Sequence, residues 1–315
     1  MAKKIRIVFA GTPDFAAPFL NSLLNESDFE VVAVLTQPDK PAGRGQVLTY
    51  SPIKKLAEKK NINILQPENI KDEKIIIDLF DLSPDFLVVV AFGQIIPKEI
   101  LNIVKYGNIN VHPSLLPKYR GASPIQSAIL NGDQETGITI MLMDELMDHG
   151  PILAQQKISL NGNETADLLR QELSEIGKNL LVKVVADYFL GKITAQAQNH
   201  EAATYCRAIN KDEAKINWHN PAAVIEKQIR AYYSWPVAWT LYNNKRIKIF
   251  PPAKSLSDIK LKKSGEVFLS NNQLAVACGT DDALIISSIQ LEGRPQMNAD
   301  DFLRGNQNIL GQILD

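Results

Sequence analysis

Three polar side chains alternate with apolar ones along residues 108–112, a segment with the composition of a buried strand. Asn108, Asn110 and His112 share one strand face, because successive side chains of a strand point to opposite sides. Asn110 offers an amide donor and His112 an imidazole, and such a pair can hold a carbonyl oxygen and stabilise negative charge that develops there. The alternative is that both are polar groups satisfied by hydrogen bonds within the core.

The position of this segment favours a ligand site. Pro113 ends the strand because proline has no N–H to donate to a neighbouring strand. Residues 114–117 (Ser-Leu-Leu-Pro) then form a short apolar segment beside the two polar side chains. Open α/β sheets bind their ligands at the carboxyl ends of their strands, which is where Asn110 and His112 lie.

The elements that position this strand are predicted from apolar runs that alternate with helical patterns. Residues 5–10, 31–36 and 86–91 are such runs, and they predict a Rossmann-like, mostly parallel, doubly wound sheet. Of the Gly-rich dinucleotide fingerprint only Gly11 is present, so no dinucleotide cofactor is inferred. After residue 237 five short β-rich runs, separated by turns such as Asn243-Asn244, predict a small β-barrel. We expect domains at residues 1–190 and 210–315, joined by a linker at 191–209.

Two loops carry further polar residues. Residues 144–150, which include Asp148, hold three carboxylates after a predicted strand, and such a run is either solvated or the partner that His112 needs. Residues 37–46 are rich in Pro and Gly and carry Lys40 and Arg44, with Arg44 between Gly43 and Gly45. This second loop is either an ordinary surface loop or one whose arginine contacts a nucleic acid.

The composition is that of a soluble globular protein, with 45% hydrophobic and 22% charged residues in 315. We expect no membrane partner, because no apolar run reaches about 18 residues, and no signal peptide, because the apolar run at the N-terminus is too short. Two cysteines far apart favour the reducing cytoplasm, and no Cys/His cluster indicates a metal. From Cys206 onward 14 Lys and Arg face 11 Asp and Glu, weak support for a polyanionic partner.

The run at residues 108–126 reads Asn-Ile-Asn-Val-His-Pro-Ser-Leu-Leu-Pro-Lys-Tyr-Arg-Gly-Ala-Ser-Pro-Ile-Gln and resembles the signature of folate-dependent formyltransferases. The resemblance extends over the whole chain, through residues 9–15, 37–45, 143–150 and 234–236. Over this length the chain resembles the members of the family that act on aminoacyl-tRNA. The resemblance implies transfer of a formyl group from 10-formyltetrahydrofolate to methionine on initiator tRNA, for translation initiation. It also implies that the second domain is an OB-like, tRNA-binding barrel.

The resemblance also implies roles for individual residues. Asn110 and His112 are expected to stabilise an oxyanion. Asp148 matches the aspartate of a Leu-Asp-Thr-Gly turn that faces the histidine, although Met147 and His149 depart from that pattern. His149 is expected to be exposed and not catalytic. The residues expected to hold the folate are Ser114, Leu115, Leu116 and Pro117, and those expected to contact tRNA are Lys40, Gly43, Arg44 and Gly45.

Other functions remain open at this point. The nearest is a formyltransferase of the same fold that acts on an amino-sugar nucleotide. Glycinamide ribonucleotide transformylase fits less well, because that enzyme needs no second domain. An RNA-binding module without catalysis and a pyridine-nucleotide dehydrogenase are the alternatives from other classes. We expect a monomer.

Overall fold

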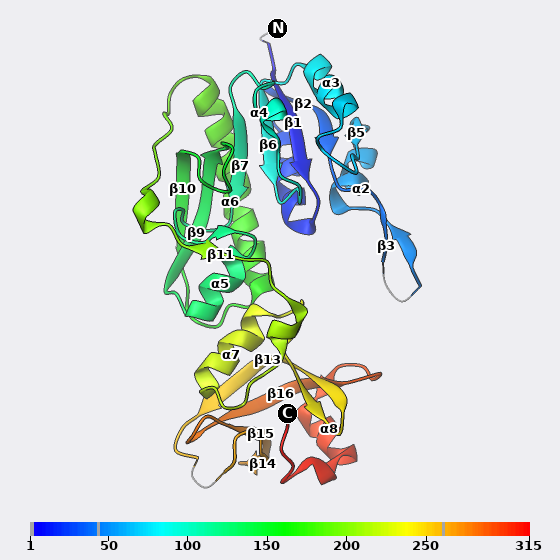
Figure 1. The fold of residues 1–315 in the computed structure, drawn as a ribbon, viewed down its shortest axis with the longest axis vertical. Coiled ribbons are helices and arrows are strands. Elements are labelled where there is room, and N and C mark those ends of the chain that lie inside the picture. Colours follow the sequence, from blue (N-terminus) through cyan, green and yellow to red (C-terminus); the bar gives the residue numbers. More distant parts are fainter. Residues whose placement is uncertain (1–2, 43–44, 260–261) are drawn as a thin grey trace. The chain divides into compact units, whose positions relative to one another are not determined.

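The computed structural model of the chain describes residues 3–42, 45–259 and 262–315, and they form two compact units (Figure 1). The first unit contains the chain up to Gly121 together with residues 136–158 and 170–205. The second contains residues 122–135, 159–169 and 206–315, so two short segments from the first two thirds of the sequence belong to it. The division into domains 1–190 and 210–315 stays a prediction.

The first unit is built on one sheet. Within the described residues its strands follow the order β10 (Ile152–Ser159), β9 (Glu135–Leu142), β7 (Asn108–His112), β6 (Phe86–Val90), β1 (Ile5–Gly11), β2 (Phe29–Leu35) and β5 (Ile64–Leu65). The pairs from β7 to β5 are parallel, whereas β9 is antiparallel to β7. The predicted mostly parallel sheet is therefore confirmed.

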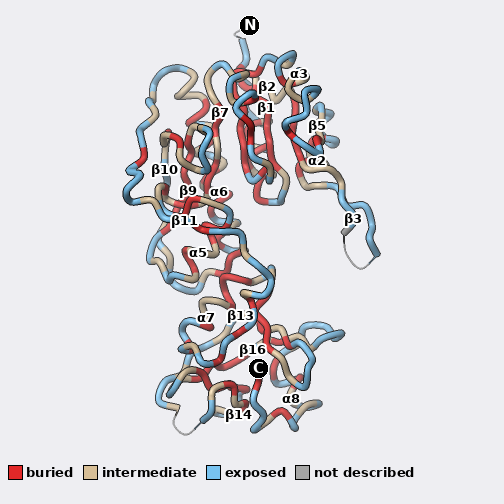
Figure 2. The backbone as a smooth tube through the Cα atoms, in the orientation of Figure 1, coloured by how far each residue is buried: buried red, intermediate tan, exposed pale blue. Residues whose placement is uncertain are grey.

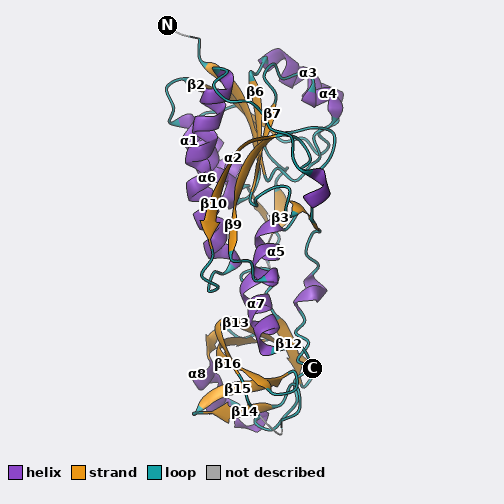
Figure 3. Cartoon of the chain, turned by 90° about the vertical axis from the view of Figure 1, so that its left-hand side faces the viewer, coloured by secondary structure: helices purple, strands orange, loops and turns teal. Residues whose placement is uncertain are grey.

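Helices cover both faces of this sheet (Figure 3). On one face Val8 of β1 shares a core cluster with Leu79 of α3 (Glu73–Leu82) and Ile100 of α4 (Lys98–Leu101). On the other, Gly177 of α6 (Ala166–Phe189) lies against the ring of Phe19 of α1 (Ala17–Leu24), with α2 (Pro52–Lys59) nearby. Buried residues concentrate along the central strands (Figure 2), as expected for parallel strands that are covered twice.

Short elements connect these layers. The segment that was expected to be a loop after β2 contains a hairpin, β3 (Lys40–Ala42) with β4 (Val47–Thr49). A second pair joins β8 (Arg120–Gly121) to β11 (Tyr205–Cys206). The 3-10 helices are η1 (Asp14–Ala16), η2 (His200–Ala202), η3 (Lys211–Ala214) and η4 (Gln307–Ile309).

The second unit is built on an antiparallel sheet. Its strands follow the order β12 (Trp239–Tyr242), β13 (Lys245–Leu256), β16 (Asp282–Leu291), β15 (Gln273–Cys278) and β14 (Val267–Ser270), with β17 (Met297–Asn298) paired to β16. Its helices are α5 (Pro124–Asn131), α7 (Ala222–Ala231) and α8 (Ala299–Gly305). The turn predicted at Asn243 and Asn244 is confirmed, with φ of +49° and +60°.

The C-terminal tail joins the two edges of this sheet. Asp315 and Leu241 of β12 exchange backbone hydrogen bonds of 2.9 and 3.1 Å. At the other edge, Val267 of β14 donates to the carbonyl of Gln312 at 2.9 Å. The tail therefore hydrogen-bonds to both edge strands, and the curled sheet is a small barrel, as predicted. In the described ranges, no helix is both long and apolar enough to cross a membrane.

Candidate active site

Asn110, His112 and Asp148 meet at the carboxyl end of β7. Asn110 Nδ2 donates a hydrogen bond of 3.1 Å to Asp148 Oδ1, and His112 Nδ1 lies 3.5 Å from Asp148 Oδ2. The His112 and Asp148 side chains are 5% and 12% exposed, so solvent screens their interaction little. The structure thus brings together the three residues that were predicted to be catalytic, and their roles stay a prediction.

The histidine has a fixed orientation. Its Nε2 lies 2.9 Å from the carbonyl oxygen of Tyr119. Because a carbonyl oxygen accepts and cannot donate, Nε2 carries the hydrogen of this bond. Nδ1 is then the ring nitrogen that faces Asp148 and can exchange a proton with the site.

The loop after β9 holds Asp148 in an uncommon conformation. Its φ is +50°, a left-handed value that aspartate tolerates better than most residues. Its Oδ2 accepts a hydrogen bond of 2.8 Å from the backbone N–H of Gly121, and its carbonyl accepts one of 3.0 Å from Gln198 Nε2. These contacts fix both ends of the residue, and so they fix the carboxylate in front of His112.

Gly150 is required where this loop returns to β9. A Cβ at Gly150 would lie 2.0 Å from the carbonyl oxygen of Leu142, the last residue of β9, and 3.3 Å from the backbone nitrogen of Asp144. Real Cβ atoms do not approach backbone so closely, so any larger residue must displace the loop. The glycine of the family pattern therefore has a steric explanation here.

Two residues without a predicted role support the same loop. Gln198 Nε2 donates to the carbonyls of Asp148 and Gly150, at 3.0 and 2.7 Å, and its Oε1 accepts from Arg120 Nε and Nη2, at 3.2 and 2.7 Å. Arg120 is 2% exposed. Gln198 lies in a segment without periodicity that was interpreted as a linker, and no sequence signal marks it. Arg120 lies within the family signature, which was the available signal.

His149 is half-buried, so the expectation that it is exposed is wrong. Its Nδ1 lies 2.6 Å from Asp144 Oδ2, and its ring stacks on that of His200 with centroids 4.0 Å apart. His200 Nδ1 accepts a hydrogen bond of 2.8 Å from Arg120 Nη2, since a guanidinium only donates. Burial, followed by the charges of His149 and Arg120, lowers the pKa of His200. The neutral ring that this contact needs is therefore favoured.

The segment predicted to hold the folate has an inner and an outer half. Ser114 is fully buried and donates from Oγ to the carbonyl of Lys118 at 2.5 Å, and Leu116 is 3% exposed. Leu115 and Pro117 are half-buried. Ser114 and Leu116 thus hold the segment in place, while Leu115 and Pro117 have surface left for a ligand.

A cavity of about 300 Å³ lies in the first unit at the amino end of β7, where β9 ends, whereas His112 lies at the carboxyl end of β7. Its polar lining comes from α4, the start of β7 and the residues after β9, and it includes Asn108, whose Oδ1 is buried without a hydrogen-bond partner in the described part of the chain. Leu101, Leu142 and Met143 supply apolar wall.

The residues predicted to contact tRNA belong to the β3–β4 hairpin. Lys40 begins β3 and Gly45 is exposed in the turn, whereas Gly43 and Arg44 lie outside the described residues. Val47 and Leu48 of β4 are 68% and 55% exposed. The structure does not bring Lys40 or Gly45 into the Asp148 cluster.

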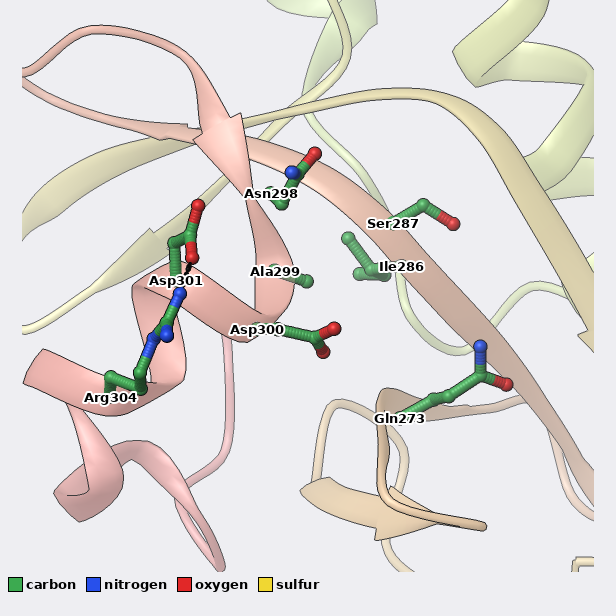
Figure 4. A pocket seen from close by; sticks show the side chains of 8 residues that line it. All are labelled: Gln273, Ile286, Ser287, Asn298, Ala299, Asp300, Asp301 and Arg304. Carbon is green, nitrogen blue, oxygen red and sulfur yellow. Dashed lines mark hydrogen bonds and ion pairs between the residues drawn. The ribbon is translucent and has the colours of Figure 1, made fainter.

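A second cavity, of about 520 Å³, lies in the second unit between β15, β16 and the start of α8 (Figure 4). Asp300, Asn298 and Gln273 line it, and Asp301 forms an ion pair with Arg304. Its charged lining residues, Asp300, Asp301 and Arg304, are exposed. In the described ranges, no group of three or more His, Cys, Asp and Glu has an arrangement that could hold a metal.

A fold of this kind with an Asn-His-Asp cluster at a strand end defines a class of group-transfer enzyme, and comparison with known families identifies that class. Residues 3–185 match the family Formyl transferase, and residues 208–307 match Formyl transferase, C-terminal domain. The chain belongs to the formyl transferase family.

Similar curated relatives carry the name methionyl-tRNA formyltransferase. That of Lachnospira eligens is 42% identical and that of Halalkalibacterium halodurans 43% identical, and each alignment covers 98% of this chain and at least 98% of the relative. That of Pseudomonas fluorescens is 40% identical over the whole chain and 99% of its own length. The similarity therefore extends through both units.

Solved structures share the fold. WlaRD, a sugar 3N-formyl transferase described in the presence of dTDP and 5-N-formyl-THF, matches with a TM-score of 0.64 and 24% identity, over 93% of this chain and all of its own. HypX from Aquifex aeolicus in complex with tetrahydrofolic acid matches with 0.63 and 14%, over 99% of this chain. This chain spans about half the length of HypX, 48%. At these identities the match concerns the fold alone.

Proposed function

We propose that this protein transfers the formyl group of 10-formyltetrahydrofolate to the α-amino group of methionine on initiator tRNA. The observation that carries the proposal is the Asp148 carboxylate, held between Asn110 at 3.1 Å and His112 at 3.5 Å. Full-length relatives that bear the name methionyl-tRNA formyltransferase, at 40–43% identity, support the choice of substrate.

The reaction moves a formyl group from one nitrogen to another. The lone pair of the amine forms a bond to the formyl carbon, and the formyl oxygen gains a negative charge. The bond between the formyl carbon and the donor nitrogen then breaks. The proton that the amine loses replaces the formyl group on the donor nitrogen, so that atoms and charges balance.

The three clustered residues suit these steps. Asn110 Nδ2 has two hydrogens and uses one on Asp148, so the other is left to stabilise the oxyanion. His112 assists at the oxyanion as the imidazolium, because Nε2 donates its hydrogen to Tyr119 and only the cationic ring also has a hydrogen on Nδ1. Asp148 orients His112 and helps to remove the proton of the amine, directly or through a water.

The donor is assigned to residues 114–117, which follow His112 at the carboxyl end of β7. Leu115 and Pro117 have half-buried surface for the folate, and Ser114 and Leu116 keep the segment in shape. When bound there, the folate supplies the formyl group and the leaving nitrogen.

Contacts to tRNA are assigned to two regions. One is the Lys40–Gly45 segment, in which Arg44 lies between Gly43 and Gly45. We assign Arg44 to contacts with the acceptor end of the tRNA. The other is the second unit, whose small barrel we propose to be OB-like, and whose residues from Cys206 onward carry 14 basic against 11 acidic side chains. A cytoplasmic monomer stays the prediction for the state in which the protein works.

The alternative substrate is an amino-sugar nucleotide, as the name of WlaRD suggests for that protein. Both reactions need the same oxyanion site, so the Asn110–His112–Asp148 cluster does not separate them. The full-length relatives, at 40–43% identity against 24% for WlaRD, favour the tRNA substrate.

Transfer of labelled formyl from 10-formyltetrahydrofolate tests the proposal directly. The purified protein is given methionyl-tRNA, a set of dTDP-linked amino sugars, or free methionine, at equal concentrations. We expect label in the methionyl-tRNA, with kcat/KM at least about 100-fold above that for any amino sugar. Label in an amino sugar alone would show that an amino sugar, and not methionyl-tRNA, is the substrate. Absence of label from every amine would reject the proposed formyl transfer.

Replacement of Gly150 by alanine tests the role of the loop. The added Cβ must move the backbone away from Leu142 O, and with it Asp148, so we expect kcat to fall on the order of 10²-fold. Gly305→Ala is the matched control, because no heavy atom lies within 4 Å of its added Cβ and its φ needs no glycine. Equal kcat in wild type and Gly150→Ala would show that the loop can shift without harm.

A further inference from the structure

Tyr205 presents an aromatic face to solvent from a fixed position. Its side chain is 73% exposed, more than the 50% of Trp235 and the 67% of Phe80. Its backbone pairs in β11 with β8, and its hydroxyl oxygen accepts a hydrogen bond of 3.4 Å from Arg120 Nη1. An exposed aromatic residue alone is unremarkable in a folded protein. One that is tethered at both backbone and hydroxyl keeps its open ring ready for a ligand.

The residue that tethers Tyr205 is a buried cation, Arg120. Arg120 is 2% exposed, and within the described residues its side chain hydrogen-bonds to the neutral groups Gln198 Oε1, His200 Nδ1 and Tyr205 Oη. Burying a guanidinium without a carboxylate costs stability. The positive charge that remains beside Tyr205 attracts a polyanion, and the guanidinium carbon lies 6.0 Å from the centre of the ring.

The same contacts connect this ring to the proposed catalytic carboxylate. Arg120 donates to Gln198, and Gln198 donates to the carbonyl oxygens of Asp148 and Gly150. Gly121, the neighbour of Arg120 in β8, donates its N–H to Asp148 Oδ2 at 2.8 Å. Tyr205 therefore lies beside the residues that support Asp148, at the margin of the site where the amine of the substrate must arrive.

We propose that Tyr205 is the stacking site for the unpaired nucleobase at the 3′ end of the aminoacylated RNA. The inference rests on the proposed function, because the methionyl ester is attached to the ribose of that terminal nucleotide. When the amine lies at Asp148, the terminal base is the next large group of the substrate. An unpaired base has a free aromatic face, and stacking on tyrosine is the usual way in which proteins bind one.

The steady-state kinetics of three variants test this assignment, with the donor saturating. Loss of one stacked base lowers affinity about 5- to 150-fold, so we expect Tyr205→Ala and Tyr205→Leu to raise KM for methionyl-tRNA at least about fivefold. Tyr205→Phe keeps the ring and should stay within about twofold of wild type. Phe80→Ala, which removes a comparably exposed ring from α3, is the matched control and should change nothing.

Two further measurements separate this site from others. A methionyl-tRNA with 2-aminopurine at its 3′ end should lose fluorescence on binding to wild type and Tyr205→Phe, but not to Tyr205→Leu. Methionine methyl ester has no base, so its turnover should be equal in wild type and Tyr205→Leu.

If KM for the folate rises instead of KM for the tRNA, the ring binds the donor and the assignment is wrong. Equal KM and equal quenching in all variants would also overturn it, whereas failure of wild type to formylate methionyl-tRNA would reject the proposed function itself.

Discussion

Asp148→Asn should lower kcat for formyl transfer on the order of 10³-fold, while KM for both substrates changes by no more than about threefold. The carboxylate accepts hydrogen bonds from Asn110 Nδ2 and the Gly121 N–H on separate oxygens, and it faces His112 Nδ1 with a negative charge. An asparagine has one accepting oxygen, so one of these donors loses its partner. The charge opposite the imidazole disappears as well, and with it the group that helps to remove the proton of the amine.

The measurement is the initial rate of labelled formyl transfer with both substrates saturating, together with a thermal melt to confirm folding. Asp187→Asn provides the control, because it removes a carboxylate from α6 that lies 3.6 Å from Lys192 Nζ and has no part in the site. A folded Asp148→Asn protein with kcat within about tenfold of wild type would rule out Asp148 as part of the catalytic machinery.

The fold was largely predictable because its signals are local. The apolar runs at β1 and β6 are buried on both faces, and period and length identify such strands without knowledge of their neighbours. The asparagine pair at Asn243 and Asn244 identifies its hairpin turn for the same reason. The hairpin at Lys40–Ala42 was missed, since a segment rich in Pro and Gly carries no strand period.

The site was predictable in part. Asn110 and His112 lie two residues apart on one strand, so their meeting follows from the geometry of a strand. That Asp148 joins them depends on the pairing of β7 with β9, which the resemblance suggested and no local pattern shows. Gln198 could not be found in this way, because its function consists of hydrogen bonds to backbone carbonyls 48 and 50 residues away. Any amide in a loop has the same appearance in a sequence.

Asn110→Ala should lower kcat about 10²- to 10³-fold, because it removes a donor that is aimed at the place where the oxyanion develops. The same rate assay measures it, again with a melt to confirm folding. Asn21→Ala, on the surface of α1, is the control, since Asn21 lines a separate groove with Lys178 and Glu175 of α6. An effect confined to KM would show that Asn110 binds substrate without selecting the transition state, contrary to the proposed role.

The double variant Asn110→Ala/Asp148→Asn distinguishes one catalytic unit from two independent contributions. Asn110 Nδ2 donates to Asp148 Oδ1 at 3.1 Å, so each single change already disturbs the partner of the other. If the residues work as a unit, the double variant should lose about as much as Asp148→Asn alone, on the order of 10³-fold. If their contributions are independent, the losses multiply to about 10⁵-fold or more. The multiplicative result would mean that the hydrogen bond between the two side chains has no part in catalysis, and that Asn110 acts on the oxyanion without any help from Asp148 in holding its amide.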